Sequence, residues 1–328
     1  MRSIKLPSWT KRLLGLDPVA VPPHVFALGA HGLAYGSFHK SSQGGFVFDV
    51  YRALDLDPGT FAQGPLGGPL HDPMAFEAQL RPFVAGLPDP PKSALLVLPD
   101  AWLRLSFLET GPLPRQREAQ LEVLRWKLKR LVPFRVEDLR LSAVEVAPIS
   151  GQAEPGRLLV GFGSEVLFSQ LETAFRAAGV RLGVLTNVSL AVLAGLERNV
   201  APGQLAALVI AQHESFTVSF FQGGEPVLYR FKGFTEEMPE SVRASSVRRD
   251  LRLTTSYVRE HFSTTPLARV FLVAPPELED VWLSWLHEEL DAPPEALAFE
   301  HLPLVRTTTG PTWPMTAQLL GAACLEVA

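Results

Sequence analysis

The apolar residues in the middle of the chain follow a helical spacing first and a strand spacing afterwards. Between residues 115 and 131 they recur three or four positions apart, which places them on one face of an amphipathic α-helix. Pro133 ends the predicted helix, because proline disfavours the α conformation in the residue before it. After Phe134 the apolar positions nearly alternate with polar ones, as in a strand with one buried face. The residues that carry the two patterns are Leu121, Leu124, Leu128 and Leu131 for the helix and Leu139, Leu141, Ala143 and Val146 for the strand.

The rest of the chain alternates between strand-like and helix-like segments, and this alternation starts twice. Each half opens with several apolar strands and continues with buried strands followed by helices, a pattern that favours a mixed or parallel sheet covered by helices. We therefore expect an α/β protein of two lobes, with a small α/β unit inserted in the first lobe and a helical insert in the second. The expected boundaries are 1–23 for a leader that need not be ordered, 24–200 for the first lobe with its insert at about 109–155, and 201–328 for the second lobe with its insert at about 235–264.

Composition and charge narrow the class of protein. The chain has 328 residues, of which 47% are hydrophobic and 20% charged, and a net charge of −4; this is typical of a globular protein and not of a general nucleic-acid binder. Cys324 is the single cysteine, so an intramolecular disulfide and a thiolate metal cluster are excluded and a cytoplasmic location is favoured. No apolar run approaches the roughly 20 residues that span a bilayer. Residues 2–14 are mildly basic and amphipathic, and we favour a loose leader there over a contact with anionic lipid.

Several segments, in this order along the chain, resemble the actin-like ATPase fold and, within it, the type IV pilus assembly protein PilM. The charged helix that runs into LVPF and the acidic pair Glu137-Asp138 is similar to the PilM motif, and more loosely to the cytoplasmic part of the type II secretion protein GspL. Four further segments are similar to the end of the first lobe and to the hairpin, helix and terminal helix of the second: LTNVSLAVLAGLE, GGEPVLYRFKG, RRDLRLTTSYVREHF and LLGAACLEVA. The resemblance covers most of the chain and implies a two-lobed actin-like (ribonuclease H-like) fold.

The same resemblance indicates where a nucleotide would bind, and this sequence departs from the pattern at all three places. Actin-like ATPases hold magnesium and phosphate on two Asp-x-Gly turns and adenosine beside a Gly-Gly turn, since Mg²⁺ prefers carboxylate oxygens and a backbone packed on phosphate leaves no room for a Cβ. The matching residues here are Ala27-Leu28-Gly29, Ala211-Gln212-His213 and Ala274-Pro275-Pro276-Glu277. We therefore expect no catalytic residue, no metal and no nucleotide cofactor, and we favour a fold that has lost hydrolysis. An active ATPase that uses Mg-ATP and an actin-like small-molecule kinase stay open as alternatives.

Proteins of this family lie beneath the inner membrane and bind the short cytoplasmic tail of a bitopic PilN-like protein, in a groove between the inserted unit and the first lobe. The resemblance implies a scaffold or adaptor of a type IV pilus or type II secretion-like assembly machine, peripheral to the inner membrane through partners that include other assembly components but no nucleic acid. The helix from residue 115 to 131 and the strand after it would form part of the groove. We expect the groove or its support at Leu124, Leu128, Phe134 and Leu139, although core packing explains the same pattern. The resemblance leaves open which machine is involved and whether the chain forms homo-oligomers.

Three other groups of residues have a functional and a plainer interpretation, and we favour the plainer one in each. His31 and His213 adjoin the two altered turns and could face each other across the cleft as a pH-sensitive or anion site, but filling of vacated space explains them better. Trp282 and Trp285 fit the core face of a helix better than a cofactor site. An arginine-rich helix fits a solvated, ion-paired face better than an anion-binding surface; its arginines and their expected partners are Arg243, Arg248, Arg249, Arg252, Arg259, Asp250 and Glu260. No spacing of His, Asp or Glu resembles a metal site, and no Walker, dinucleotide or Gly-x-Ser-x-Gly motif occurs.

Overall fold

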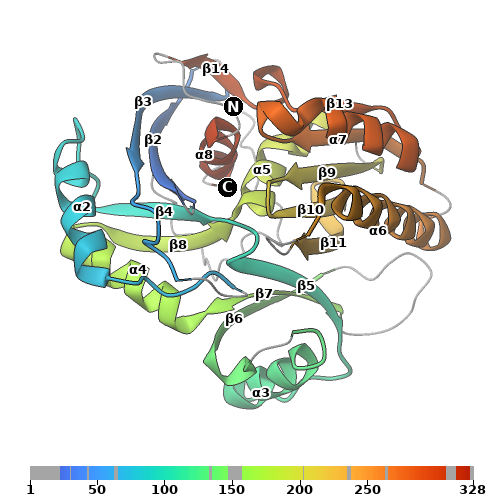
Figure 1. Ribbon diagram of the computed structural model, residues 1–328, viewed down its shortest axis with the longest axis horizontal. Coiled ribbons are helices and arrows are strands. Elements are labelled where there is room, and N and C mark those ends of the chain that lie inside the picture. The colour runs from blue at the N-terminus through green and yellow to red at the C-terminus, as the bar shows by residue number, and fades with distance from the viewer. Residues whose placement is uncertain are drawn as a thin grey trace.

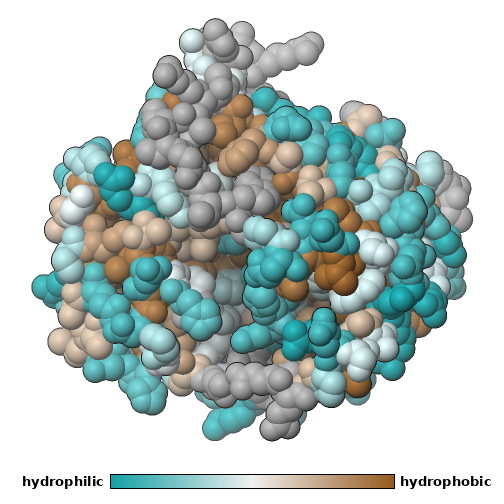
Figure 2. Space-filling model, turned by 45° about the horizontal axis from the view of Figure 1, so that its top comes forward, coloured by the Kyte–Doolittle hydropathy of each residue, from teal (hydrophilic) through white to brown (hydrophobic). Residues whose placement is uncertain are grey.

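The computed structural model has two lobes, each built on a central sheet, and a smaller third sheet beside the first lobe (Figure 1). The structure describes residues 23–29, 31–42, 44–62, 66–132, 135–146, 157–201, 203–234, 238–262, 265–307 and 315–325. Figure 2 shows that the surface recedes between the two halves of the molecule, and that hydrophobic residues on this face lie in separate groups among hydrophilic ones. The two-lobed α/β architecture expected from the sequence is therefore present.

The first lobe is organised on a six-stranded sheet in the order β14-β3-β2-β1-β4-β8. β1, β2 and β3 are antiparallel neighbours, whereas β4 and β8 extend the sheet in parallel. β4 is an unbroken apolar run after its first residue, which is typical of a strand covered on both faces. The strands of this sheet are β1 His24–Leu28, β2 Gly32–Lys40, β3 Phe46–Asp55, β4 Ser93–Leu98, β8 Arg181–Asn187 and β14 Leu304–Thr307.

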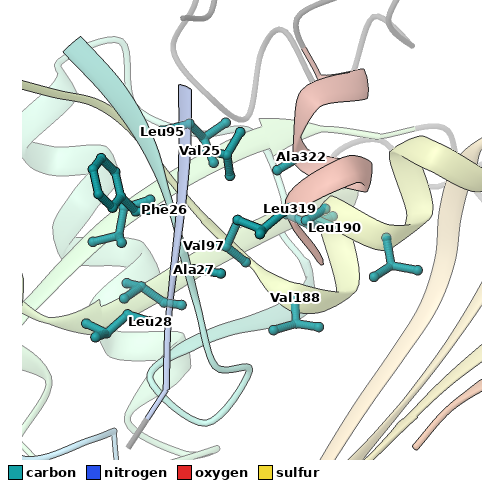
Figure 3. Packing of buried hydrophobic residues seen from close by; sticks show 14 of the residues in the cluster. Val25, Phe26, Ala27, Leu28, Leu95, Val97, Val188, Leu190, Leu319 and Ala322 are labelled. Carbon is teal, nitrogen blue, oxygen red and sulfur yellow. The ribbon is translucent and has the colours of Figure 1, made fainter. Parts of the chain in front are cut away.

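Helices cover both faces of this sheet. Phe26 and Leu28 point to one side of β1, where the Phe26 ring contacts that of Phe175 in α4 with centroids 5.0 Å apart. Val25 and Ala27 point to the other side, where α5 and α8 lie (Figure 3). Successive β1 residues therefore serve two layers of the core, as the strand period of two requires. The helices of this lobe are α2 Pro73–Ala85, α4 Glu165–Ala177, α5 Val188–Leu196 and α8 Met315–Cys324.

The second lobe contains a five-stranded sheet in the order β11-β10-β9-β12-β13. β9 is buried along its whole length, because Leu208 faces the core shared with the first lobe and Val209 faces the core beneath α6 and α7. Trp282 and Trp285 of α7 pack in this second core, as the plainer interpretation expects. The elements of this lobe are β9 Leu205–Ala211, β10 Ser215–Gln222, β11 Glu225–Gly233, α6 Glu240–His261, β12 Leu267–Val273, α7 Pro276–Glu289 and β13 Pro294–Ala296.

The unit inserted in the first lobe is a three-stranded antiparallel sheet in the order β5-β7-β6, with α3 on one face. Leu124 and Leu128 of α3 pack in one cluster with Leu139 of β6, whereas Val144 of β6 belongs to the core of the first lobe. The sequence predicted a strand with one buried face, and this is wrong. The apolar residues of β6 lie on both faces, because the sheet lies between α3 and the first lobe. Ala143, which was assigned to the buried face, is exposed. The elements are β5 Leu103–Glu109, α3 Arg117–Leu128, β6 Leu139–Glu145 and β7 Arg157–Ser164.

α3 is shorter than the predicted helix at both ends. It begins at Arg117 and ends at Leu128, after which the chain tightens into a turn in which the Leu131 N–H donates to the Leu128 carbonyl at 2.8 Å. Such i to i−3 bonds are common where a helix ends. The turn takes Leu131 off the apolar face and leaves it 57% exposed. Pro133 and Phe134, predicted to stop the helix and to border the groove, lie outside the described residues.

The end of the chain returns to the first lobe. β14 pairs in parallel with β3, and α8, buried from Thr316 to Cys324, packs against α5. A helix that is apolar on all sides must be enclosed, and the first-lobe core encloses this one. Residues 304–325 thus differ from the predicted division, which assigned 201–328 to the second lobe. The inserted unit is also longer than the expected 109–155, since its sheet runs from residue 103 to 164.

Candidate functional site

The turn between β1 and β2 contains the first of the altered nucleotide positions. Ala27 and Leu28 end β1 with exposed fractions of 0% and 2%, and the Gly29 N–H donates to the Gly32 carbonyl at 2.8 Å. A Cβ on Gly29 would meet only that carbonyl, at 3.8 Å, so packing inside the protein does not require the glycine. Residues 27–32 contain no carboxylate, the ligand that magnesium prefers.

The other two altered positions lie against each other in the second lobe. The His213 Nε2 atom hydrogen-bonds to the Glu277 carboxylate at 2.9 Å, and the Arg243 guanidinium donates to the His213 carbonyl at 2.9 Å. α7 begins at Pro276, soon after β12, so a proline-led helix replaces the expected glycine turn. His213 therefore hydrogen-bonds to Glu277, and among the described residues no hydrogen bond joins it to His31.

A buried polar group joins the two lobes where β4 and β8 end. Asp100 is 4% exposed and accepts hydrogen bonds from the Ser189 hydroxyl at 2.7 Å and the Ser189 N–H at 3.2 Å. Asn187 donates to the Leu103 carbonyl at 3.0 Å and to the hydroxyl of Tyr229, in β11, at 3.4 Å. Burial raises the pKa of Asp100 to about 6 and the pKa of Tyr229 well above its ordinary value. Carboxyls with shifted pKa values often mark active sites, but this one is enclosed and hydrogen-bonded, so it forms part of the joint between the lobes.

A cavity of about 240 Å³ lies between the three-stranded sheet and the edge of the first-lobe sheet. Consecutive residues of β6 (140–142) and β8 (182–186) line it, so it borders the backbone edges of these strands and not only one face. β6 and β8 are each the last strand of their sheet, and such strands present N–H and C=O groups for pairing. The buried apolar residues of the walls are Leu103, Leu105, Phe162, Phe168, Val184 and Leu190.

Arg140 forms the polar end of this cavity. Its guanidinium donates to the two carboxylate oxygens of Glu165 at 2.8 and 2.6 Å and also to Glu172 of α4. The hydrogen bond from Arg140 lowers the pKa of Glu165 to about 2, and the bond to Glu165 raises the pKa of Arg140. The Thr186 hydroxyl, by contrast, is buried and has no hydrogen-bond partner among the described residues. The cavity thus combines apolar walls, a fixed ionic group and one unsatisfied hydroxyl.

Comparison with solved structures shows which proteins share this fold. The chain is similar to a chain of the PilM-PilN type IV pilus biogenesis complex, at 16% identity and a TM-score of 0.70, over 95% of this chain and 100% of that one. It is also similar to a Bacteroides thetaiotaomicron protein with an actin-like ATPase fold (10% identity, 86% of this chain and 93% of that one, TM-score 0.49). A third similar structure is the cytoplasmic domain of EpsL, an inner membrane component of the type II secretion system of Vibrio cholerae (11% identity, 92% and 93%, TM-score 0.47). No family model and no curated protein sequence matches the chain. The fold is shared with a chain of the PilM-PilN complex.

The resemblance to PilM that the sequence motifs indicate is thus confirmed at the level of the fold. Three of the four residues expected at the groove or its support are buried inside the inserted unit. Leu124, Leu128 and Leu139 are 3%, 0% and 4% exposed and pack between α3 and the three-stranded sheet. None of them lines the cavity beside β8. Core packing, the plainer interpretation, describes these three; they support a sheet whose other face forms the cavity wall. Phe134 lies outside the described residues.

The cavity residues that sequence reasoning missed come from β5, β8 and α4. Leu105, Leu185 and Glu172 meet there, although no periodicity links segments so distant in the sequence. Two glycines in the sequence could have indicated the cavity, because a glycine inside a strand often marks a place where another group approaches closely. Gly161 and Gly183 both line the cavity, and a Cβ on Gly161 would lie at ordinary contact distance, 3.6 Å, from Leu105.

The arginine-rich helix α6 is paired, but not with the expected carboxylates. Arg252 bonds to Glu289 at 2.8 Å and Arg259 to Asp291 at 2.6 Å, so the partners of these arginines come from the end of α7 and the loop after it. Asp250 pairs instead with Lys232 of β11 at 3.1 Å. Three of its five arginines, Arg248, Arg252 and Arg259, are therefore ion-paired within the fold, which agrees with the plainer interpretation of this helix.

Three kinds of site chemistry receive no support from the described part of the chain. No group of three His, Cys, Asp or Glu residues there could hold a metal ion. The thiol of Cys324 is buried in α8, and burial raises its pKa to about 12, which disfavours the reactive thiolate. None of the helices in those ranges is long and apolar enough to cross a membrane.

Proposed function

We propose that this chain is a non-catalytic cytoplasmic adaptor of a type IV pilus or type II secretion-like assembly machine, and that it holds the cytoplasmic tail of a PilN-like inner-membrane protein. The fold shared with a chain of the PilM-PilN complex supports the choice of partner. The observation that carries the proposal is the apolar cavity bordered by two terminal strands, β6 and β8.

An extended tail suits this cavity for a physical reason. A terminal strand can accept an added peptide strand through main-chain hydrogen bonds, while pockets beside it take alternate side chains. Leu103, Leu105 and Phe168 form such a pocket beside β8. The Thr186 hydroxyl, which has no partner in the described structure, would gain one from a polar group of the tail, and satisfying a buried polar atom stabilises a complex.

The test uses peptides that match the cytoplasmic tails of bitopic proteins encoded beside this chain. We expect one of them to bind, measured by fluorescence anisotropy, and a Gly161→Leu variant to weaken its affinity at least about tenfold, because the new side chain fills the cavity. Gly111→Leu is the matched control, since a Cβ at Gly111 meets no atom within 4 Å. If no tail binds, or if Gly161→Leu binds as tightly as Gly111→Leu, the proposal is wrong.

We further propose that the interlobe turns no longer serve Mg-ATP. The apolar Ala27 and Leu28, the contact between His213 and Glu277 and the proline-led start of α7 support this, because each replaces a group that would hold metal, phosphate or adenosine. Isothermal titration with Mg-ATP should show no binding in the micromolar range. Micromolar binding would revive the active ATPase, and consumption of ATP in the presence of candidate sugars would favour the kinase.

The position at the membrane follows from the same partner. We propose that the chain is peripheral to the inner membrane through its partners. In fractionation it should sediment with membranes when the PilN-like protein is co-expressed and remain in the supernatant without it. Sedimentation with membranes that lack the partner would contradict this and would indicate a direct lipid contact.

A further inference from the structure

We propose that a second groove, between the three-stranded sheet and the second lobe, binds an acidic and apolar segment of a partner protein in an extended conformation. The groove has a volume of about 890 Å³ and is formed by β5, the end of α3, the start of β7, β11 and α6. Figure 1 shows β5 beside β11, which it contacts, with α3 and α6 nearby. The groove borders the edge of the three-stranded sheet opposite to β6, so it is separate from the cavity of the proposed tail.

Three large apolar side chains converge on this groove although they are open to solvent. Trp126 and Leu131 are each 57% exposed and Leu253 is 53% exposed, and all three line the groove. Trp126 and Leu131 come from α3 and the turn after it, whereas Leu253 comes from α6, far along the sequence. Single exposed apolar residues are ordinary on protein surfaces, but a contiguous group rimmed by polar residues marks an interaction surface.

The charges of the groove are unbalanced in one direction. Four of its lining side chains are cationic and one, Glu109, is a carboxylate; the cations are Lys127, Arg130, Arg157 and Arg230. Within the described ranges none of the four forms an ion pair, whereas Arg140 and two arginines of α6, Arg252 and Arg259, bond to carboxylates. Three of them donate hydrogen bonds to neutral oxygens. Lys127 donates to the Glu109 carbonyl at 2.6 Å, Arg157 to the Val227 carbonyl at 2.5 Å and Arg230 to the Thr254 hydroxyl at 2.9 Å. Glu109 is opposite Arg157 in the strand register and acts on it electrostatically, so the four cations still exceed the carboxylates of the lining by three. Such an excess of positive charge favours an acidic ligand.

The geometry favours a peptide over a nucleic acid. Arg130 lies 4.8 Å from the centroid of the Trp126 ring and Arg157 lies 4.1 Å from that of Phe107, so the arginines occupy ring faces on which bases would stack. β5 and β11 are both terminal strands, and their backbone edges are suited to pair with an extended chain. The exposed leucines provide contacts for its apolar side chains. A segment in which acidic and apolar residues alternate matches both sets of groups.

The binding test uses three fluorescein-labelled probes on the full chain: a capped dodecapeptide of alternating Leu and Glu, its counterpart with Lys in place of Glu, and single-stranded oligo-dT. The Glu peptide should bind at least about tenfold more tightly than the Lys peptide and should weaken as salt rises. Arg130→Glu should reduce its affinity about tenfold. Lys129→Glu should not, because Lys129 is exposed on the same turn and does not line the groove. Leu253→Ser should weaken binding, with Val242→Ser, 51% exposed on the same helix, as its control.

Four outcomes would overturn the proposal. They are equal binding of the Glu and Lys peptides, binding unaffected by Arg130→Glu and Leu253→Ser, tighter binding of oligo-dT that depends on the same residues, and self-association of the chain that Arg130→Glu abolishes. The third outcome would assign the groove to nucleic acid and the fourth to a second copy. Circular dichroism would establish that each variant is folded, which is expected because every substituted side chain is exposed. None of these results bears on the tail cavity, which Gly161→Leu tests separately.

Discussion

Replacing Asp100 by asparagine should change how the stability of the protein depends on pH. Burial raises the pKa of this carboxyl from 3.8 to about 6, so the folded protein binds the proton more tightly than the unfolded chain does. Stability from the protonated carboxyl is therefore fully present below about pH 4 and is lost as pH rises through about 6. At 1.36 kcal/mol per pKa unit, the loss amounts to about 3 kcal/mol.

The magnitude is measured as a difference between two proteins. Urea unfolding, followed by circular dichroism at steps between about pH 4 and pH 8, gives the free energy of unfolding of the native sequence and of Asp100→Asn. Other titrating groups contribute to both and cancel. The variant should therefore gain roughly 2.5 kcal/mol relative to the native protein over this range, because at pH 4 the unfolded carboxyl, with its ordinary pKa of 3.8, is already partly ionised. Asp138→Asn, whose side chain is 63% exposed, is the control for the removal of one surface carboxyl. A parallel profile for Asp100→Asn would refute the argument. It would mean that the hydrogen bonds of Ser189, Thr217 and Tyr229, which lower the pKa of Asp100, offset the effect of its burial.

Two further substitutions test packing. Leu128→Ala should lower the free energy of unfolding in urea by about 2–5 kcal/mol, because Leu128 is 0% exposed between α3 and the three-stranded sheet. Leu131→Ala should change it by less than about 0.5 kcal/mol. Equal effects would contradict the placement of these two side chains. Gly321→Ala should lower the melting temperature by several degrees, since the new Cβ would lie 2.4 Å from the Ala191 carbonyl. Gly111→Ala, where a Cβ meets nothing within 4 Å, should leave the melting temperature unchanged, and an unaffected Gly321→Ala protein would show that α5 and α8 are not in such close contact.

Local chemistry made many of the elements predictable. Asp72 caps α2 by accepting hydrogen bonds from the Met74 and Ala75 N–H groups at 2.9 and 3.0 Å, which is the role expected of an aspartate before a proline-led helix. Gly179 ends the helical region with a φ of +86°, a conformation that glycine adopts without strain. Signals of this kind involve neighbours within a few residues, so a sequence pattern contains all the information they need.

Pairing between distant segments explains what the sequence did not reveal. β14 adds to β3, about 250 residues earlier in the chain, and neither strand has a local feature that selects the other. The tail cavity depends in the same way on Leu105 and Leu185 meeting across two sheets. The periodicity of α3 was interpreted correctly as an apolar face, but periodicity cannot tell whether such a face covers a core or lines a groove; Leu124 and Leu128 cover a core.

The three-stranded sheet of the inserted unit contributes to both proposed binding sites, and its strand order explains how. Each of its two terminal strands borders a cavity together with a terminal strand of another sheet. β6 borders the tail cavity with β8 of the first lobe, and β5 borders the second groove with β11 of the second lobe. Proteins usually protect terminal strands from unwanted pairing. Here four terminal strands, β5, β6, β8 and β11, border the two cavities. Because β5 and β6 both pair with β7, one small sheet supplies an edge to each of the two cavities.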